Sequence, residues 1–280
     1  MKRTVHGFNP GFSERILRTI FKLIIKILRL NGPSKFSNLF IQLLDPICST
    51  IWKPTKQKIF FRTGHGRLLW RVNTLYSEEP LMIDWLTSFN SRDIFLDIGA
   101  NVGTYTIPAA IQSKIVYACE LDPINIGILK ENIHLNSLHQ KVLIIPFGGA
   151  STTEVVNVHY RDISKGDALQ SIGRDSLFDT IPTKEKHIMD QLVFPLDLVF
   201  QMFNLEQPNK IKIDVDGNEK TLFDGAKNII LRADEIYFEN ENTEGSSYVI
   251  EQIKAAGFRI VKSEHFKNVG EGSNLVFRRG

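Results

Sequence analysis

The chain has 280 residues, of which 42% are hydrophobic and 23% are charged. This length and composition predict one large α/β domain with a small appendage and exclude a mostly disordered chain. The formal net charge of +3 does not indicate nucleic-acid binding, although the N-terminus holds a local basic patch. The two cysteines, Cys48 and Cys119, stand neither in C-x-x-C nor near a histidine at metal spacing, which argues against disulfides and zinc and favours a reducing compartment.

Residues 13–30 predict an amphipathic helix that Ser13 caps and Asn31-Gly32-Pro33 ends. Its charges interrupt every apolar run, so it is neither a signal peptide nor a membrane-spanning helix. Two interpretations remain open: the helix lies on an anionic lipid surface, or it packs on its own domain. In the first interpretation, the protein is cytoplasmic and this helix holds it at the inner surface of the membrane. The basic residues recur every three or four positions: Arg15, Arg18, Lys22, Lys26 and Arg29.

The punctuated stretch from Pro33 to Pro54 predicts a connector that ends the appendage. We therefore expect an N-terminal helix and connector over residues 1–56 and the main domain over residues 57–280. Within the main domain, Lys58–Phe61 and Leu68–Val72 predict a β-hairpin, and Glu78–Phe89 predicts a helix.

From Ile94 onwards, strand and helix patterns alternate, which predicts parallel crossover units in a doubly wound α/β sheet. Helices are expected at Pro123–Leu135 and Glu219–Leu231, and the last two strands are expected to pair as a hairpin. The polar stretch Tyr160–Gln191 is interpreted either as a functional lid or as a passive loop. The expected strands are IFLDIG, KIVYACE, VLIIPF, IKIDVDG, EIYFEN, FRIVK and NLVFR.

The first expected strand ends in D-I-G-A-N-V-G, where an acid and two glycines meet the start of a helix. Doubly wound sheets bind ligands beyond the carboxyl ends of their strands, and Gly99 and Gly103 allow the backbone to approach a ligand. The spacing is not G-x-G-x-x-G, and Asp97 would repel a pyrophosphate. A cationic ligand is favoured over a nicotinamide cofactor, which makes an oxidoreductase improbable.

Glu120 ends the second expected strand, the position from which an acid receives the two ribose hydroxyls of an adenosine. Alone, it fits equally well a charge at a helix N-terminus. Together with Asp97 it indicates S-adenosylmethionine, an adenosine that carries a positive charge and an amino acid. The remaining residues assigned to the cofactor site are Ala100, Asn101, Thr104, Leu121 and Phe147.

The segment K-I-D-V-D-G-N-E follows another strand and supplies the candidate catalytic acids. Asp214 is expected to orient the acceptor or to take its proton, with Asp216 nearby; alternatively, Asp216 belongs to a turn that caps the next helix. Lys212 is expected to form a structural ion pair with Glu239 or Asp97, since an unpaired ammonium inside a sheet is costly. D-V-D-G also matches the start of haloacid-dehalogenase phosphatases, but there it follows the first strand.

Taken together, FLDIGANVGTYT, VYACELDP, LKENIHLN, PLDLVF and IKIDVDGNEKTLFDGA resemble the FkbM family of S-adenosylmethionine-dependent methyltransferases. The likeness covers roughly residues 81–277. It implies the Rossmann-like class I methyltransferase fold, with seven strands of which the last is antiparallel. It also implies O-methylation of a sugar, glycolipid or other small molecule, and cofactor binding by the residues of the first two motifs.

This resemblance leads us to expect a small-molecule or glycan acceptor. We expect no nucleic-acid partner because the charge of the whole chain is mild, and no metal because the sequence holds no His cluster. The family's usual K-I-D-V-E-G is K-I-D-V-D-G here, so that Asp216 reaches one methylene less far than the usual glutamate. A non-catalytic S-adenosylmethionine-binding module is the alternative function.

Overall fold

The computed structural model describes residues 47–64, 66–160, 171–172, 187–266 and 272–280. These residues belong to a compact unit that runs from Ile47 to Gly280. The expected helix over residues 13–30 and most of the expected insert over residues 160–191 lie outside the described part of the chain.

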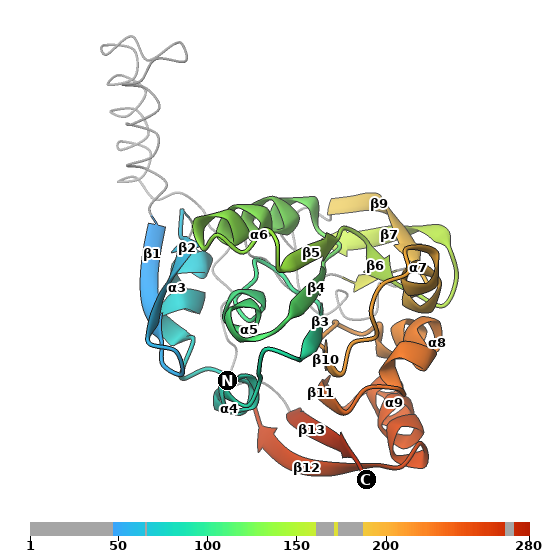
Figure 1. Ribbon diagram of the computed structural model, residues 1–280. Coiled ribbons are helices and arrows are strands. Elements are labelled where there is room, and N and C mark those ends of the chain that lie inside the picture. Colours follow the sequence, from blue (N-terminus) through green and yellow to red (C-terminus); the bar gives the residue numbers. More distant parts are fainter. Residues whose placement is uncertain (1–46, 65, 161–170, 173–186, 267–271) are drawn as a thin grey trace, which may run out of the picture. The chain divides into compact units, whose positions relative to one another are not determined.

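The centre of this unit is a seven-stranded sheet with strand order β12-β13-β11-β10-β3-β4-β5 (Figure 1). Only β13 runs antiparallel to its neighbours in the sheet. This arrangement confirms the predicted doubly wound, mostly parallel fold and the hairpin of the last two strands. The strands are β3 (Ile94–Ile98), β4 (Ile115–Cys119), β5 (Val142–Ile145), β10 (Lys210–Ile213), β11 (Glu235–Asn240), β12 (Phe258–His265) and β13 (Ser273–Arg279).

Helices cover both faces of the sheet (Figure 1). Because side chains alternate along a strand, Phe95 packs in the core on one face, while Leu96 and Ile98 pack in the core on the other. Helices α4, α5 and α6 contribute to the first core and α7, α8 and α9 to the second. Their bounds are Pro80–Thr87, Thr106–Gln112 and Pro123–Leu135, and then Leu196–Met202, Glu219–Ile230 and Glu244–Ala255.

The predicted hairpin has a different partner strand. Strand β2 (Gln57–Arg62) pairs antiparallel with β1 (Ile47–Trp52), whereas Leu68–Val72 lies in helix α3 (Gly66–Thr74). The two buried residues of this helix, Leu68 and Val72, are four positions apart, which places them on one helical face. A short apolar run of this kind fits a strand or a helix equally well, and here the helical spacing prevails.

The hairpin β1–β2 also moves the expected domain boundary. Asn132 and Asn136 on and after α6 accept hydrogen bonds from the backbone N–H groups of Arg62 and Phe60, at 2.8 and 2.9 Å. Because β2 is bound to α6 and β1 to β2, residues 47–56 belong with the main unit. The boundary therefore falls between Pro46 and Ile47 rather than after residue 56.

A second, four-stranded sheet with order β6-β9-β7-β8 was not predicted. Its long strands β7 (Glu154–Tyr160) and β9 (His187–Phe194) pair antiparallel. In the sequence, these two strands stand on either side of most of the segment that was interpreted as a lid or loop. The short strands are β6 (Gly148–Gly149) and β8 (Ser171–Ile172).

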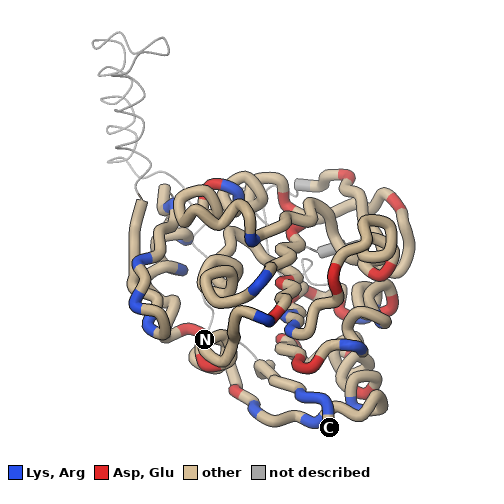
Figure 2. The backbone as a smooth tube through the Cα atoms, viewed as in Figure 1, with Lys and Arg blue, Asp and Glu red and all other residues tan. Residues whose placement is uncertain are grey.

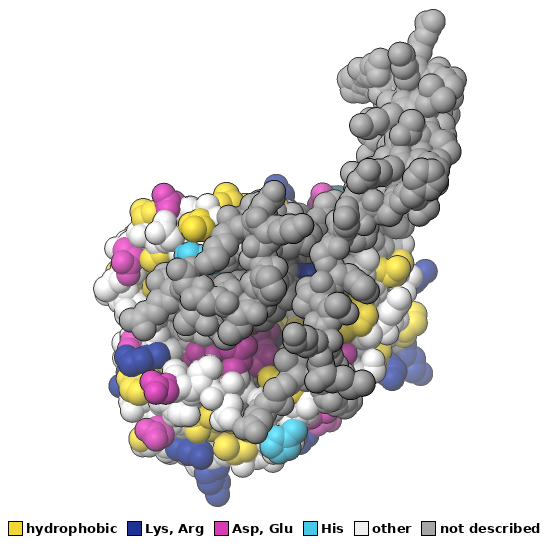
Figure 3. Space-filling view, turned by 180° about the vertical axis from the view of Figure 1, so that it is seen from behind, with side chains coloured by type: hydrophobic (Ala, Val, Ile, Leu, Met, Phe, Trp, Pro, Cys, Tyr) yellow, Lys and Arg dark blue, Asp and Glu magenta, His cyan; other side chains and the backbone are white. Residues whose placement is uncertain are grey.

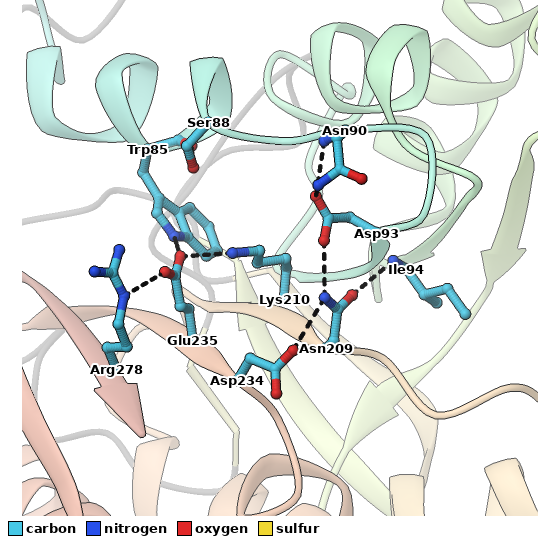
Figure 4. A network of polar contacts seen from close by, with 10 residues as sticks. All are labelled: Trp85, Ser88, Asn90, Asp93, Ile94, Asn209, Lys210, Asp234, Glu235 and Arg278. Atoms are coloured by element: carbon cyan, nitrogen blue, oxygen red, sulfur yellow. Dashed lines mark hydrogen bonds and ion pairs between the residues drawn. The ribbon is translucent and has the colours of Figure 1, made fainter. Parts of the chain in front are cut away.

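The amino ends of the central strands are joined by a polar network (Figure 4). Glu235 accepts hydrogen bonds from Trp85 Nε1 and Arg278 Nε and pairs with Lys210 Nζ, at 2.7–2.8 Å. Burial acts to raise the pKa of Glu235, but the partners, with Lys210 foremost, hold it below its usual value. The network stabilises the edge of the sheet opposite the cavity described next.

Candidate active site

A cavity of about 540 Å³ lies at the carboxyl ends of β3, β4, β10 and β11. Residues that follow each of these strands line it, among them Gly99, Glu120, Asp214 and Glu241. This is the edge at which doubly wound sheets bind ligands. The site that the sequence predicted is therefore assembled around one cavity.

The loop after β3 has a backbone that few side chains would permit. Gly99 has φ +79°, and a Cβ added there would lie 1.9 Å from the carbonyl oxygen of Asp214. Asn101 follows with φ 50°, a left-handed conformation that asparagine tolerates better than most residues. Gly103 has φ +86°, and its Cβ would meet the Leu129 side chain at 2.6 Å. Gly99 thus permits close approach of β3 to β10, and Gly103 permits packing on α6.

Glu120 is held in place by backbone donors. Its carboxylate accepts hydrogen bonds from the N–H groups of Asn101, Leu121 and Asp122 at 2.7, 2.9 and 2.8 Å. Burial raises the pKa of Glu120 to about 7, although the N–H groups of Asp122 and Asn101 oppose this shift. The side chain lines the cavity with its orientation fixed, as a residue that receives hydroxyl groups requires.

Asp97 lies below the cavity rather than in its lining. It is 1% exposed, and its Oδ2 accepts a hydrogen bond from Thr106 Oγ1 at 2.6 Å. Lys212 on the neighbouring strand stands directly opposite, with its Nζ 3.5 Å from Asp97 Oδ1. Asp97 therefore supports the cavity lining through Lys212 and Thr106 rather than belonging to it.

Lys212 is a buried cation that contacts several groups of the candidate site. Its side chain is 2% exposed, and its Nζ lies 2.8 Å from Asp214 Oδ2 and 3.2 Å from the Gly99 carbonyl oxygen. Burial lowers the pKa of Lys212, but the carboxylates of Asp214 and Asp97 outweigh burial and raise it. The structural ion pair expected for Lys212 is present, with Asp214 as the shorter contact and Asp97 as the longer one.

Asp214 links Lys212 to Glu239 on β11. Its side chain is about one-third exposed to the cavity, at 32%, and it forms a side-chain hydrogen bond with Glu239. Although burial opposes the shift, Lys212 holds the pKa of Asp214 below its usual value. Burial and then Asp214 raise the pKa of Glu239 well above its usual value. The expected Lys212–Glu239 pair is thus replaced by a Lys212–Asp214–Glu239 chain.

The sequence did not indicate several residues of the wall. Arg71 on α3, Glu79 before α4 and Tyr105 before α5 line the cavity. Burial raises the pKa of Glu79, and Asp214 adds to this effect. The sequence did not indicate Arg71 because its segment was interpreted as a strand. It did not indicate Glu79 because a glutamate before a proline is an ordinary pattern at the start of a helix.

The structure brings most of the predicted site residues together. Ala100 is buried beside the loop, at 4% exposure, and with Asp97 and Gly103 it supports the lining without belonging to it. Burial and then Asp216 and Glu219 raise the pKa of Glu241, which the sequence did not single out, to about 8. The predicted residues that line the cavity are Gly99, Asn101, Thr104, Glu120, Leu121, Phe147, Asp214 and Asp216.

The chain is similar to known methyltransferases. The Methyltransferase FkbM domain family matches residues 97–260. A solved FkbM methyltransferase of Methylobacillus flagellatus KT is 17% identical, and the match covers 73% of this chain and 47% of that one with a TM-score of 0.50.

Curated relatives match over a shorter part of the sequence. A tRNA (guanine(37)-N(1))-methyltransferase of Dictyostelium discoideum is 27% identical over 136 residues, 48% of this chain and 26% of that protein. One of Phytophthora infestans is 30% identical over 87 residues, 31% of this chain and 20% of that protein. The chain spans about a quarter or less of the length of these relatives.

Proposed function

Since the chain belongs to the FkbM family of S-adenosylmethionine-dependent methyltransferases, we propose that it O-methylates a hydroxyl of a sugar, glycolipid or other small molecule. Family membership makes the protein an enzyme with S-adenosylmethionine as its cofactor. The hydroxyl acceptor is the proposed part. The observation that supports it is the set of carboxyl groups, Asp214 among them, that line the cavity away from Glu120; we call this part of the cavity the acceptor side.

The residues present fit the cofactor. Glu120, fixed by three backbone donors, would receive the two ribose hydroxyls, and Leu121 and Phe147 offer apolar surface for the adenine. S-adenosylmethionine supplies a methyl group on a positively charged sulfur. The residues of the chain have to hold the acceptor oxygen in line with this methyl group and take the hydroxyl proton, for which Asp214 is the proposed base.

The tRNA methyltransferases among the relatives suggest a second candidate function, methylation of a nucleic-acid base. The described part of the cavity lining argues against it, because Arg71 is the one Lys or Arg side chain there. Figure 3 shows Asp and Glu side chains gathered in a hollow of the surface, and such a surface repels a phosphate backbone. Along the described backbone, Lys and Arg positions and Asp and Glu positions are interspersed, both in the middle of the fold and at its edges (Figure 2).

Transfer of a labelled methyl group tests the proposal. The protein is incubated with S-adenosylmethionine labelled on the methyl group and, in separate reactions, with tRNA and with the small-molecule and lipid fractions of the cells that naturally contain it. We expect label in a small-molecule or lipid fraction, in a methyl ether that survives mild base. Label in tRNA alone would overturn the proposed acceptor.

Glu120 is expected to control cofactor affinity. The change Glu120→Ala removes charge-assisted hydrogen bonds to the ribose and should weaken binding of S-adenosylhomocysteine by about 1–3 kcal/mol, a factor of about 5 to 150. Calorimetric titration measures this change. Glu131→Ala is the control, because Glu131 is an exposed carboxylate paired with Arg62 on the surface. Equal affinity of wild type and Glu120→Ala would remove Glu120 from the site.

The same titration repeated between pH 6 and pH 8 adds a second readout. Since burial raises the pKa of Glu120 to about 7, the side chain is mostly protonated below this pH and accepts hydroxyl protons poorly. Affinity is therefore expected to rise with pH through about 7 in the wild type, and this rise should disappear in Glu120→Ala.

No metal is expected to take part in the reaction. Within the part of the chain that the structure describes, no group of three or more His, Cys, Asp or Glu side chains is arranged to hold a metal ion. Activity should survive dialysis against a chelator. If it is lost and Mg²⁺ restores it, Asp214 and Asp216 become candidate metal ligands.

We propose a cytoplasmic location with peripheral membrane contact through residues 13–30. In the described residues, no helix is long and apolar enough to cross a membrane. Five basic residues near an anionic surface contribute about 1 kcal/mol each, in addition to apolar burial. Anionic liposomes should therefore sediment the full chain but not a chain that begins at Ile47, which keeps β1. If neither protein sediments, residues 13–30 do not bind such membranes.

A further inference from the structure

Three polar side chains on β11, β13 and β12 form a row at the edge of the sheet that lines the cavity: Glu239, Asn274 and Glu264. Asn274 on β13 stands opposite Glu239 on β11 in one register and opposite Glu264 on β12 in the other. Side chains directly opposite each other in antiparallel strands point to the same face, about 4.5–5.5 Å apart at Cβ. All three residues line the cavity. The row therefore places an amide between two carboxyl groups.

The side-chain carbonyl oxygen of Asn274 accepts no hydrogen bond from the described residues. Asn274 is 3% exposed, and within the described part of the chain its Oδ1 has no hydrogen-bond partner. Neither neighbour supplies one: Glu264 Oε2 accepts the Leu81 N–H at 2.9 Å, and the Glu239 carboxyl group is hydrogen-bonded to Asp214. A buried carbonyl oxygen without a donor destabilises the folded protein, and a ligand N–H that donates to it removes this penalty.

This row lies too far from Glu120 to serve the cofactor. Strand β13 is four strand spacings away from β4, after which Glu120 follows, and this is about 19 Å at about 4.8 Å per spacing. In S-adenosylmethionine one methylene joins the sulfur to the ribose, so the methyl group stays near the strands on which the ribose is held. The row at β11, β13 and β12 therefore faces the acceptor.

Carboxyl groups outnumber basic groups on the acceptor side. Asp216, Glu241 and Glu264 line it together with Glu239 and with Asp214, which is paired with Lys212. Within the described lining the basic side chains are Arg71 and His265. Burial and the neighbouring carboxylates of Asp216 and Glu219 raise the pKa of Glu241 to about 8, because like charges oppose its ionisation. A bound cation would relieve this repulsion.

We propose that the acceptor carries a protonated amine as well as the hydroxyl that is methylated, and that Asn274 Oδ1 binds this amine between Glu239 and Glu264. The acceptor class is then an amino sugar or another amino alcohol. This inference rests on the proposed O-methyltransferase function and narrows it.

Fractionation of the acceptor pool tests the inference. The small-molecule extract used for labelled transfer is passed over a cation exchanger, and part of the retained material is N-acetylated, which removes the positive charge of amines and leaves hydroxyls in place. Acceptor activity is expected in the retained fraction and should be lost on N-acetylation. Label that enters only unretained material, or that is unaffected by N-acetylation, would overturn the amine while leaving the methyltransferase function intact.

Variants of Asn274 test whether this residue binds the amine. Asn274→Leu removes the acceptor oxygen and should raise KM for the retained fraction about 10- to 100-fold, whereas Asn274→Asp keeps an oxygen and should retain the wild-type KM or lower it. Calorimetric titration of S-adenosylhomocysteine should give both variants the wild-type affinity within twofold, which verifies the fold. Wild-type KM in Asn274→Leu would show that the amine is not bound at Asn274.

Discussion

Replacing Asp214 by asparagine is expected to lower kcat by about 10² to 10⁴, the range typical of losing a general base. Asp214 is the carboxylate that links Lys212 at 2.8 Å to Glu239 and is exposed to the cavity. Asparagine keeps the shape and an oxygen that accepts from Lys212, but it cannot take a proton from the acceptor. The loss should appear in kcat, while the dissociation constant of S-adenosylhomocysteine stays within a few-fold of wild type.

Asp224→Asn is the matched control for this experiment. Asp224 also pairs with a lysine, Lys220, at 2.7 Å, but it lies on the outer surface of α8. This variant should retain wild-type kcat. If Asp214→Asn instead loses cofactor affinity and keeps turnover at saturating cofactor, Asp214 is a binding residue. The base is then to be sought in Asp216 or Glu239.

Replacing Lys212 by methionine is expected to lower the free energy of unfolding by about 3–5 kcal/mol, because it leaves the buried carboxyl groups of Asp97 and Asp214 without their cation. Methionine fills a similar volume, so little of the loss would come from a cavity. Urea denaturation measures the change as a lower midpoint at constant slope.

The control is Lys220→Met, in which an exposed lysine of an i, i+4 pair is removed. It should leave the unfolding midpoint close to that of wild type. A loss of less than about 1 kcal/mol in Lys212→Met would mean that Asp97 or Asp214 is protonated in the folded protein, and the charge chain described above would be wrong.

The sheet was predictable because its strands are short apolar runs with acids at their ends. The order of Asp97, Glu120 and Asp214 along the chain was enough to place them at one edge, since parallel strands bring their carboxyl ends together. The cofactor half of the candidate site depends on this local pattern, and every predicted residue of that half lies in the cavity lining or directly beneath it.

The acceptor half was not predictable in the same way. Asn274 and Glu264 meet Glu239 only through the register of β11, β13 and β12, and no local pattern encodes this register. Helix α3 was mistaken for a strand because Leu68–Val72 is too short an apolar run to distinguish the two, and Arg71 was lost with it. The hairpin partner β1 lay in a stretch that prolines had marked as a connector.

A crystal structure of the protein with S-adenosylhomocysteine would locate the cofactor within the cavity. We expect the ribose hydroxyls on the Glu120 carboxylate, the adenine against Leu121 and Phe147, and the sulfur directed toward Asp214, with Asn274 Oδ1 still open to the acceptor side. A ligand bound elsewhere, or one whose sulfur points away from Asp214, would contradict the proposed active site.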